Sequence, residues 1–205
     1  MTDKPIRTLT FGAVGWNNPQ VANALYPDDA PQAWWLPCYT SHFDTVLVPE
    51  ADWQAAAPEE VARWREELPS QFWFYLLAER APDEAHLAQL AAVGRALGER
   101  LGGVVLAGAA ADALPVAAER LDGVALFSAS AGAGGQRLWT GPDSPCPCGH
   151  AGLVDFEASP SPRALRDILE AFLACQREPW SVLFMRAPVA TFDDARVIGK
   201  LLGVT

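Results

Sequence analysis

The sequence lacks any long apolar run. No stretch approaches the roughly 20 consecutive apolar residues that a membrane-spanning helix needs. The opening residues, MTDKPIRTLT, also lack the basic, apolar and small-residue regions of a secretory signal peptide. These two absences predict a cytoplasmic protein that neither crosses nor binds a membrane.

Basic residues are also scarce. Lys and Arg number 15 against 25 Asp and Glu, which gives a formal net charge of −10 at neutral pH. A chain of this charge repels nucleic acid and anionic membrane surfaces. The charge is compatible with a small polar ligand or with a protein partner, and we expect no nucleic-acid partner.

Cysteine is sparse, with four residues in the chain: Cys38, Cys146, Cys148 and Cys175. Disulfides are rare in the cytoplasm, where thiols are kept reduced. The expected location therefore predicts four thiols and no disulfide.

Apolar residues make up half of the 205 residues, enough for one domain with a sizeable core. They gather in short runs, most of them continuous, which is typical of strands buried on both faces. The runs lie at residues 7–12, 43–48, 72–77, 103–107, 123–127, 152–156 and 180–185.

Helical patterns separate these runs. We expect helices from Pro58, from Asp83 to Leu101, from Pro115, from Ser161 and near Asp193. The alternation predicts parallel βα units, in either a doubly wound sheet or a (β/α)₈ barrel. The Gly-, Pro- and Cys-rich segment at about 128–151 interrupts the pattern and predicts a long excursion, with a short strand at 136–140.

Five ordered segments resemble the YecE-like family, a bacterial domain of unknown function. They are FGAVGW at 11–16, LYPDDAP at 25–31, HFDTV at 42–46, VARW at 61–64 and LPSQFWF at 68–74. The resemblance implies a TIM-barrel-like fold, so we expect residues 1–205 to form a single, shortened or degenerate (β/α)₈ domain. It implies no established reaction and no cofactor.

The chain departs from the family pattern at positions that would end barrel strands. Leu47 stands where the family usually has Glu, Pro49 where it has Asn, and Leu77 where it has Lys. A usual Phe-Asn-Asn reads Phe184, Met185 and Arg186 here. Because active sites of such barrels form at the carboxyl ends of the strands, these changes remove an acid/base and a cation. They predict a catalytically diverged member.

Polar and aromatic residues nonetheless follow several of the expected strands. The candidate ligand-binding residues are Trp16, Asn17, Glu50, Trp53, Glu79, Arg80 and Arg186, with Asn18 and Asp52 beside them. If they converge on one rim, they favour a small polar or sugar-like ligand. The alternative is that they are ordinary loop residues and that Trp16 packs over the barrel.

A second hypothesis is an active hydrolase acting on a sugar or a phosphate-bearing substrate. It would use Glu50 and Glu79 as an acid/base pair and Arg186 as a cation. Geometry separates the two hypotheses. An enzyme needs these groups around an open pocket, whereas a diverged barrel would have Leu47 and Leu77 filling its mouth.

Other motifs are weaker. Cys146, Cys148 and His150 in CPCGH carry zinc-binding atoms but lack a second pair of ligands, so we expect no metal. The glycine-rich segment 128–135 matches no phosphate-binding motif and is interpreted as a linker. Of the adjacent Trp34 and Trp35, one can be buried and the other exposed. An exposed pair would form a protein contact or a ligand platform, and the alternative is that both cover the apolar exterior of the barrel.

Two histidines adjoin apolar residues. His42 and His86 have no evident partners in the sequence. We interpret His42, which precedes an expected strand, as a packed or hydrogen-bonded residue and not as a base.

Overall fold

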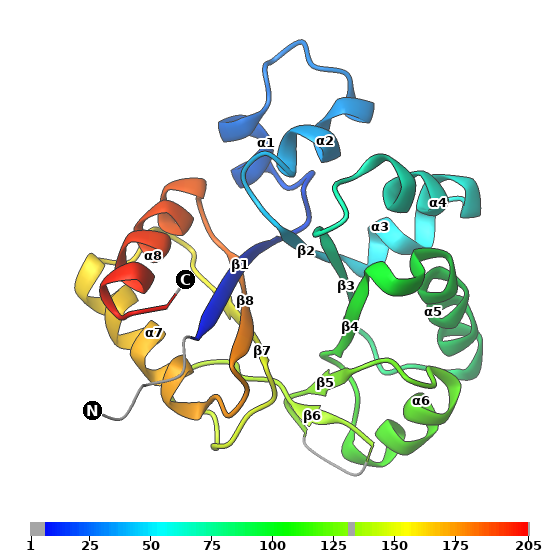
Figure 1. The fold of residues 1–205 in the computed structure, drawn as a ribbon. Coiled ribbons are helices and arrows are strands. Elements are labelled where there is room, and N and C mark those ends of the chain that lie inside the picture. Colours follow the sequence, from blue (N-terminus) through cyan, green and yellow to red (C-terminus); the bar gives the residue numbers. More distant parts are fainter. Residues whose placement is uncertain (1–6, 131–133, 205) are drawn as a thin grey trace.

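One sheet of parallel strands curls into a barrel at the centre of the molecule (Figure 1). The computed structural model describes residues 7–130 and 134–204. Within them the strands are β1 (Thr8–Val14), β2 (Thr45–Val48), β3 (Trp73–Ala78), β4 (Leu101–Leu106), β5 (Leu126–Ser128), β6 (Gln136–Arg137), β7 (Ala151–Asp155) and β8 (Trp180–Arg186). The expected TIM-barrel-like fold is confirmed.

The two edges of the sheet meet at Trp139. The strand order is β6-β5-β4-β3-β2-β1-β8-β7, so β6 and β7 lie at the edges. Trp139, just after β6, forms a parallel bridge to Gly152 of β7. Its amide donates to the Ala151 carbonyl at 3.1 Å, and its own carbonyl accepts from the Leu153 amide at 2.8 Å. These bonds satisfy backbone groups that an open edge would leave exposed.

Helices cover the outside of the barrel (Figure 1). They are α1 (Pro19–Leu25), α2 (Trp35–Tyr39), α3 (Glu50–Ala55), α4 (Pro58–Glu67), α5 (Glu84–Leu97), α6 (Leu114–Arg120), α7 (Pro162–Cys175) and α8 (Val189–Leu201). In Figure 1, α1 and α2 stand apart from the other helices, beyond the ends of β1 and β2. None of the helices in the described part of the chain is long and apolar enough to span a bilayer.

The core has two layers, one between sheet and helices and one inside the barrel. The inner layer contains the rings of Tyr75, Phe127 and Phe184 together with Leu47 and Leu77. Leu47 is fully buried and Leu77 is 1% exposed. These two leucines therefore fill the barrel interior.

Several boundaries differ from the expected ones. The helix predicted to reach Leu101 ends at Leu97 and is capped by Gly98, whose φ of 56° favours glycine, and Leu101 instead begins β4. The short helices α1, α2 and α3 were not predicted, because their few turns carry little apolar periodicity. In the excursion at 128–151, a two-residue strand, β6, lies within the expected 136–140, and residues 131–133 of the linker lie outside the described residues.

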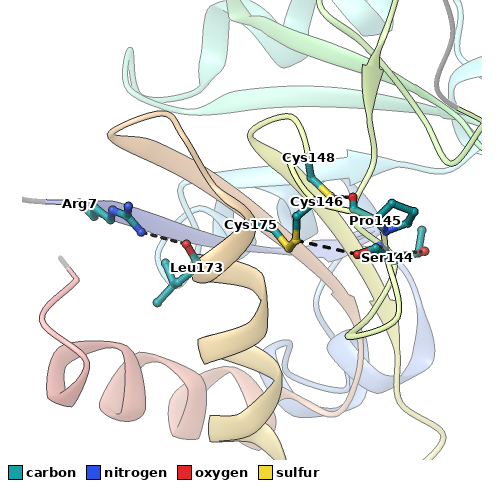
Figure 2. Close-up of a disulfide and its surroundings, with 8 residues drawn as sticks. Arg7, Ser144, Pro145, Cys146, Cys148, Leu173 and Cys175 are labelled. Carbon is teal, nitrogen blue, oxygen red and sulfur yellow. Dashed lines mark hydrogen bonds between the residues drawn. A yellow bond between two sulfur atoms is a disulfide. The ribbon is translucent and has the colours of Figure 1, made fainter.

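A disulfide joins the excursion to α7 (Figure 2). It links Cys146 to Cys175, the last residue of α7, while Cys38 and Cys148 are free. The prediction of four thiols is therefore wrong for this pair. Sequence separation hides the contact, because the two cysteines meet only once α7 packs beside β7. The cytoplasmic location stays a prediction, since disulfides are more typical of oxidising compartments.

Candidate functional site

The structure separates the predicted site residues into three groups. Glu79 and Arg186 lie at the mouth of the barrel, at the carboxyl ends of β3 and β8. Glu50, Trp53 and Arg80 form a hydrogen-bonded cluster beside β3 and α5. The third group is Trp16 and Asn17 with Asp52, which line a groove outside the barrel. The residues therefore do not converge on a single pocket.

Arg186 occupies the barrel mouth between two carboxylates. Its Nη2 donates to Oε1 of Glu79 at 2.9 Å, and its Nη1 donates to Oδ2 of Asp155 at 3.2 Å. The contacts join the ends of β3, β7 and β8. Glu79 and Asp155 are more than half exposed, so these ion pairs are solvent-screened and contribute little to stability.

A cavity of about 350 Å³ adjoins this ion pair. Its wall contains Val14, Asn18 and Pro49 beside Glu79 and Arg186. Asn18 is committed to the fold, because its side-chain amide donates to the carbonyls of Val14 and Gly15, each at 2.8 Å. Two of the polar groups in this wall, Glu79 and Arg186, are thus paired with each other, and Asn18 is satisfied by backbone.

Glu50 holds the turn that follows β3. One of its carboxylate oxygens, Oε2, accepts from the amides of Glu79 at 2.6 Å and Arg80 at 3.2 Å. The other, Oε1, accepts from Nε of Arg80 at 2.9 Å and from Nε2 of Gln54 at 3.1 Å. The side chain is only 10% exposed. A carboxylate with four donors positions backbone and is poorly placed for proton transfer.

His86 and Trp53 complete the cluster around Glu50. His86 stacks on Trp53 with ring centroids 5.2 Å apart, and Trp53 donates its indole N–H to the Leu77 carbonyl at 2.8 Å. Nε2 of His86 lies 3.4 Å from Oε1 of Glu50, close enough for an ion pair but outside hydrogen-bond geometry. We expect a neutral imidazole here, because burial lowers the His86 pKa more than the nearby Glu50 raises it.

The pKa of Glu50 is lowered by these contacts. Burial alone would raise this pKa, but the amides of Glu79 and Arg80, the Arg80 side chain and His86 together favour the ionised form. Glu50 is therefore charged at neutral pH. A general acid needs the opposite shift, as in glycosidases whose acid has a raised pKa.

The third group lines a groove of about 440 Å³. The groove lies between the segment containing Gln32, Trp35 and Leu36 and the helices α3 and α4. Trp16 forms part of its wall and is buried against Trp64, with ring centroids 5.1 Å apart and planes nearly perpendicular. Trp16 thus packs beside the barrel and does not plug its mouth.

Asp52 lies in the wall of this groove and has one unpaired, buried oxygen. Its Oδ1 accepts from Nδ2 of Asn17 at 3.2 Å. Its Oδ2 is buried and has no hydrogen-bond partner among the described residues. Burial raises the pKa of Asp52, and the Asn17 bond only partly opposes this. A buried acceptor without a donor is costly, so this oxygen favours a ligand that donates a hydrogen bond.

Two site residues were missed by sequence reasoning. Asp155 is the last residue of β7 and the second-to-last residue of the strand predicted at 152–156, so a search for acids near strand ends could have found it. His86 lies within a helix pattern, far from any strand end, so no signal in the sequence connects it with Glu50. His42, by contrast, is exposed, and its carbonyl accepts from Arg196 at 2.6 Å.

The remaining candidates do not form a metal centre. Cys146 is bonded to Cys175, which leaves Cys148 and His150 from the CPCGH segment. No three His, Cys, Asp or Glu side chains gather as a possible metal site in the described part of the chain. Of the adjacent tryptophans, Trp34 is 64% exposed, and Trp35 is half-buried, stacked on Tyr26 at 5.1 Å.

Comparison with protein families matches residues 10–106 to a family described as "Protein of unknown function DUF72". The match runs from β1 to the end of β4, the region that also carries the motifs quoted above. No curated protein matches the chain.

Two solved structures share the fold. A DUF72 family protein from Thermotoga maritima is 12% identical, with a TM-score of 0.70 over 96% of this chain and 99% of that chain. A DUF72 family protein from Enterococcus faecalis is also 12% identical, with a TM-score of 0.67 over 98% of this chain and all of that chain. At this identity the likeness concerns the fold alone.

Proposed function

We propose that this protein is a catalytically diverged YecE-like barrel that binds a small polar ligand in the groove beside Trp16, Asn17 and Asp52. The buried Oδ2 of Asp52, which has no donor among the described residues, carries the proposal. Asp52 itself lies in the wall of a groove of ligand size that also contains aromatic side chains.

The lining favours a neutral ligand rich in hydroxyl groups. Carboxylates in the groove are Asp52, Glu60 and Glu67, against the single cation Arg63. This balance disfavours phosphates and carboxylates. Sugar hydroxyls donate well to a carboxylate, and the apolar faces of Trp16 and Trp35 suit the C–H faces of a sugar ring.

The alternative hydrolase has less support. Glu50 accepts four hydrogen bonds from the protein, and Glu79 is paired with Arg186. Neither carboxylate is available as the free acid/base partner that glycoside hydrolysis requires. A protein partner is the other alternative, and the exposed Trp34 at the edge of the α2 segment is its best anchor.

The test is a titration with a panel of neutral monosaccharides, followed by ¹H–¹⁵N NMR of the backbone and indole signals. We expect shifts at Trp16 and Asn17 and an affinity about tenfold weaker in Asp52→Asn, since a charged hydrogen bond is lost. The matched control is Asp122→Asn, an exposed carboxylate remote from the groove. No shift for any sugar, or equal affinity in Asp52→Asn, would contradict the proposal.

Asp52→Asn should also change the stability of the protein when no ligand is present. The raised pKa of Asp52 means that folding disfavours its ionised form, so the free energy of unfolding falls as pH rises through that pKa. Asp52→Asn removes this cost at pH 7 and should raise Tm by roughly 1–2 °C after allowing for partial exposure. At a pH below the pKa of Asp52 in the unfolded chain, the difference should vanish.

A further inference from the structure

A separate cavity of about 450 Å³ opens at the amino-terminal end of the barrel. Its wall includes the first residues of five strands: Thr8, Thr45, Trp73, Leu101 and Trp180. Because all strands are parallel, this end is opposite to Arg186 and to the turn after β1 that carries Trp16. In barrels of this type the amino-terminal end normally serves stability, so a ligand-sized cavity here is unexpected.

Two large aromatic side chains at this cavity remain open to solvent. Trp73 and Trp180 are each 46% exposed. They project from β3 and β8, which are separated in the sheet by β2 and β1. Tryptophan is costly to expose, and exposed aromatic side chains around a concavity mark binding sites more often than isolated surface residues do.

Aromatic rings also form the inner part of the cavity. His150 lies against Trp180, with ring centroids 3.9 Å apart, and against Phe127, with centroids 4.6 Å apart and nearly perpendicular planes. Tyr75 lines the same cavity and lies directly on Gly102, where a Cβ atom would overlap its ring. The rings are therefore held by packing, and the cavity is largely formed before any ligand arrives.

The cavity is uncharged but has hydrogen-bonding groups. Among the described residues, none of those lining it is acidic or basic at neutral pH. Burial lowers the His150 pKa to about 4, so the imidazole is neutral. His150 is only 6% exposed, and its Nε2 has no hydrogen-bond partner in the described part of the chain. This nitrogen is covered in the ligand-free chain, so a ligand in the cavity pairs with it only after a small movement of the His150 ring, and that pairing removes the cost of leaving the nitrogen without a partner.

We propose that this amino-terminal cavity binds a neutral, planar, one- or two-ring aromatic compound that carries a hydrogen-bonding group, held between Trp73, Trp180 and Tyr75 and bonded through His150. The volume matches a ligand of this size. Flat rings gain most from aromatic walls through stacked or edge-to-face contacts. The site is independent of the groove at Asp52.

Other ligand classes fit this cavity less well. Anions and cations would lose hydration without gaining a countercharge. Sugars are usually bound by several carboxylate, amide or guanidinium groups, and none of these side chains in the described ranges lines this wall, whose polar groups are hydroxyls such as those of Thr10 and Ser181, the indole N–H groups of its tryptophans and the His150 imidazole. A neutral aromatic ligand leaves fewest of its polar groups unpaired.

The experiment is isothermal titration of the full chain with indole and with benzothiophene, which has the same shape but no N–H donor. We expect saturable 1:1 binding of both, tighter for indole. Trp180→Ala should weaken indole binding about tenfold, because one aromatic wall is lost. The matched control is Trp34→Ala, which truncates a more exposed tryptophan outside this cavity. It should leave the affinity for indole unchanged.

Two further variants keep the test decisive if Trp180→Ala folds poorly. Thr10→Phe should abolish binding by filling the cavity while every aromatic wall remains. His150→Phe should remove the preference for indole over benzothiophene while both still bind.

Three results would overturn the proposal: no saturable binding of either compound, equal indole affinity in Thr10→Phe, or an effect of Trp34→Ala as large as that of Trp180→Ala. Asp52→Asn should leave indole binding unchanged, so failure at one site is distinguishable from failure at the other.

Discussion

Glu50 follows Pro49 at the end of β2, where the sequence predicts a place on the barrel rim. Its carboxylate instead binds the turn after β3 through the amides of Glu79 and Arg80. Glu79, a strand-end acid of the same type, does lie at the mouth, paired with Arg186. The direction of each side chain, and not its residue type, thus separates a structural carboxylate from one at the rim.

Replacing Glu50 tests this structural role. Glu50→Gln should lower the free energy of unfolding by about 2 kcal/mol at pH 7, because charge-assisted bonds to two amides and Arg80 are weakened. The pKa of Glu50 is lowered in the folded protein, so its contribution is fully present above the ordinary value of 4.5 and is lost as pH falls through the folded pKa. Urea unfolding at pH 7 and pH 3.5 should therefore give a smaller difference at the lower pH.

The control for this prediction is Glu84→Gln. Glu84 also pairs with an arginine, Arg120, at 2.7 Å, but its side chain is 82% exposed. We expect Glu84→Gln to lower the free energy of unfolding by less than about 0.5 kcal/mol, because exposed ion pairs contribute little. Equal losses in both variants would mean that the Glu50 contacts contribute no more than a surface ion pair.

Among the secondary-structure elements, β6 is the least regular part of the barrel. It has only two residues, and Trp139 beyond it completes the contact with β7. Trp139 is fully buried and packs against Phe172 of α7 in a tilted arrangement, with ring centroids 5.1 Å apart. One side chain therefore links the junction of the two sheet edges to the helical layer.

Truncating Trp139 should weaken this junction. Trp139→Ala should lower the free energy of unfolding by about 4 kcal/mol, because it leaves a large cavity. Trp139→Phe should cost clearly less, because it keeps a ring and removes an indole N–H that is buried without a partner among the described residues. Hydrogen exchange at the Leu153 amide, which donates to Trp139, should accelerate in Trp139→Ala, while amides between β1 and β8 change less. Uniform acceleration would show that the junction does not open separately.

At the scale of the whole molecule, the disulfide connects the excursion before β7 with the end of α7 (Figure 2). The amide of Cys148 adds a second link by donating to the Cys175 carbonyl at 3.2 Å. Arg7 donates to the Leu173 carbonyl at 2.9 Å, so the first described residue also contacts the end of this helix. The excursion is thus held against the end of α7 by a covalent bond and a hydrogen bond.

Reduction should lower the stability of the whole domain. Cys146 and Cys175 are 29 positions apart, and a cross-link closing a loop of this size contributes roughly 3–4 kcal/mol. Tm should fall on adding dithiothreitol, and Cys146→Ser/Cys175→Ser should show the lower Tm with no response to dithiothreitol. Thiol titration in denaturant should find the two free thiols, Cys38 and Cys148, before reduction. Four reactive thiols without reductant would contradict the disulfide.

The sequence by itself determined the alternation of parallel strands and helices. Continuous apolar runs specify strands buried on both faces, and the stripe from Leu165 to Phe172, capped by Ser161, specifies α7, because both signals arise from neighbours in the chain. The order of motifs along the first 80 residues added the barrel class. These features are local or depend on order along the chain, so no three-dimensional contact was needed to find them.

Only the tertiary structure decided where the polar groups meet. It separated Trp16 from Glu50 and Arg186, joined Cys146 to Cys175, and enclosed His150 beside Trp180 at the opposite end of the barrel. A parallel barrel brings together strand ends far apart in sequence, and a small rotation decides whether a side chain faces the mouth, the wall or the helices. Spacing along the chain does not encode that rotation; packing against the other strands and helices does.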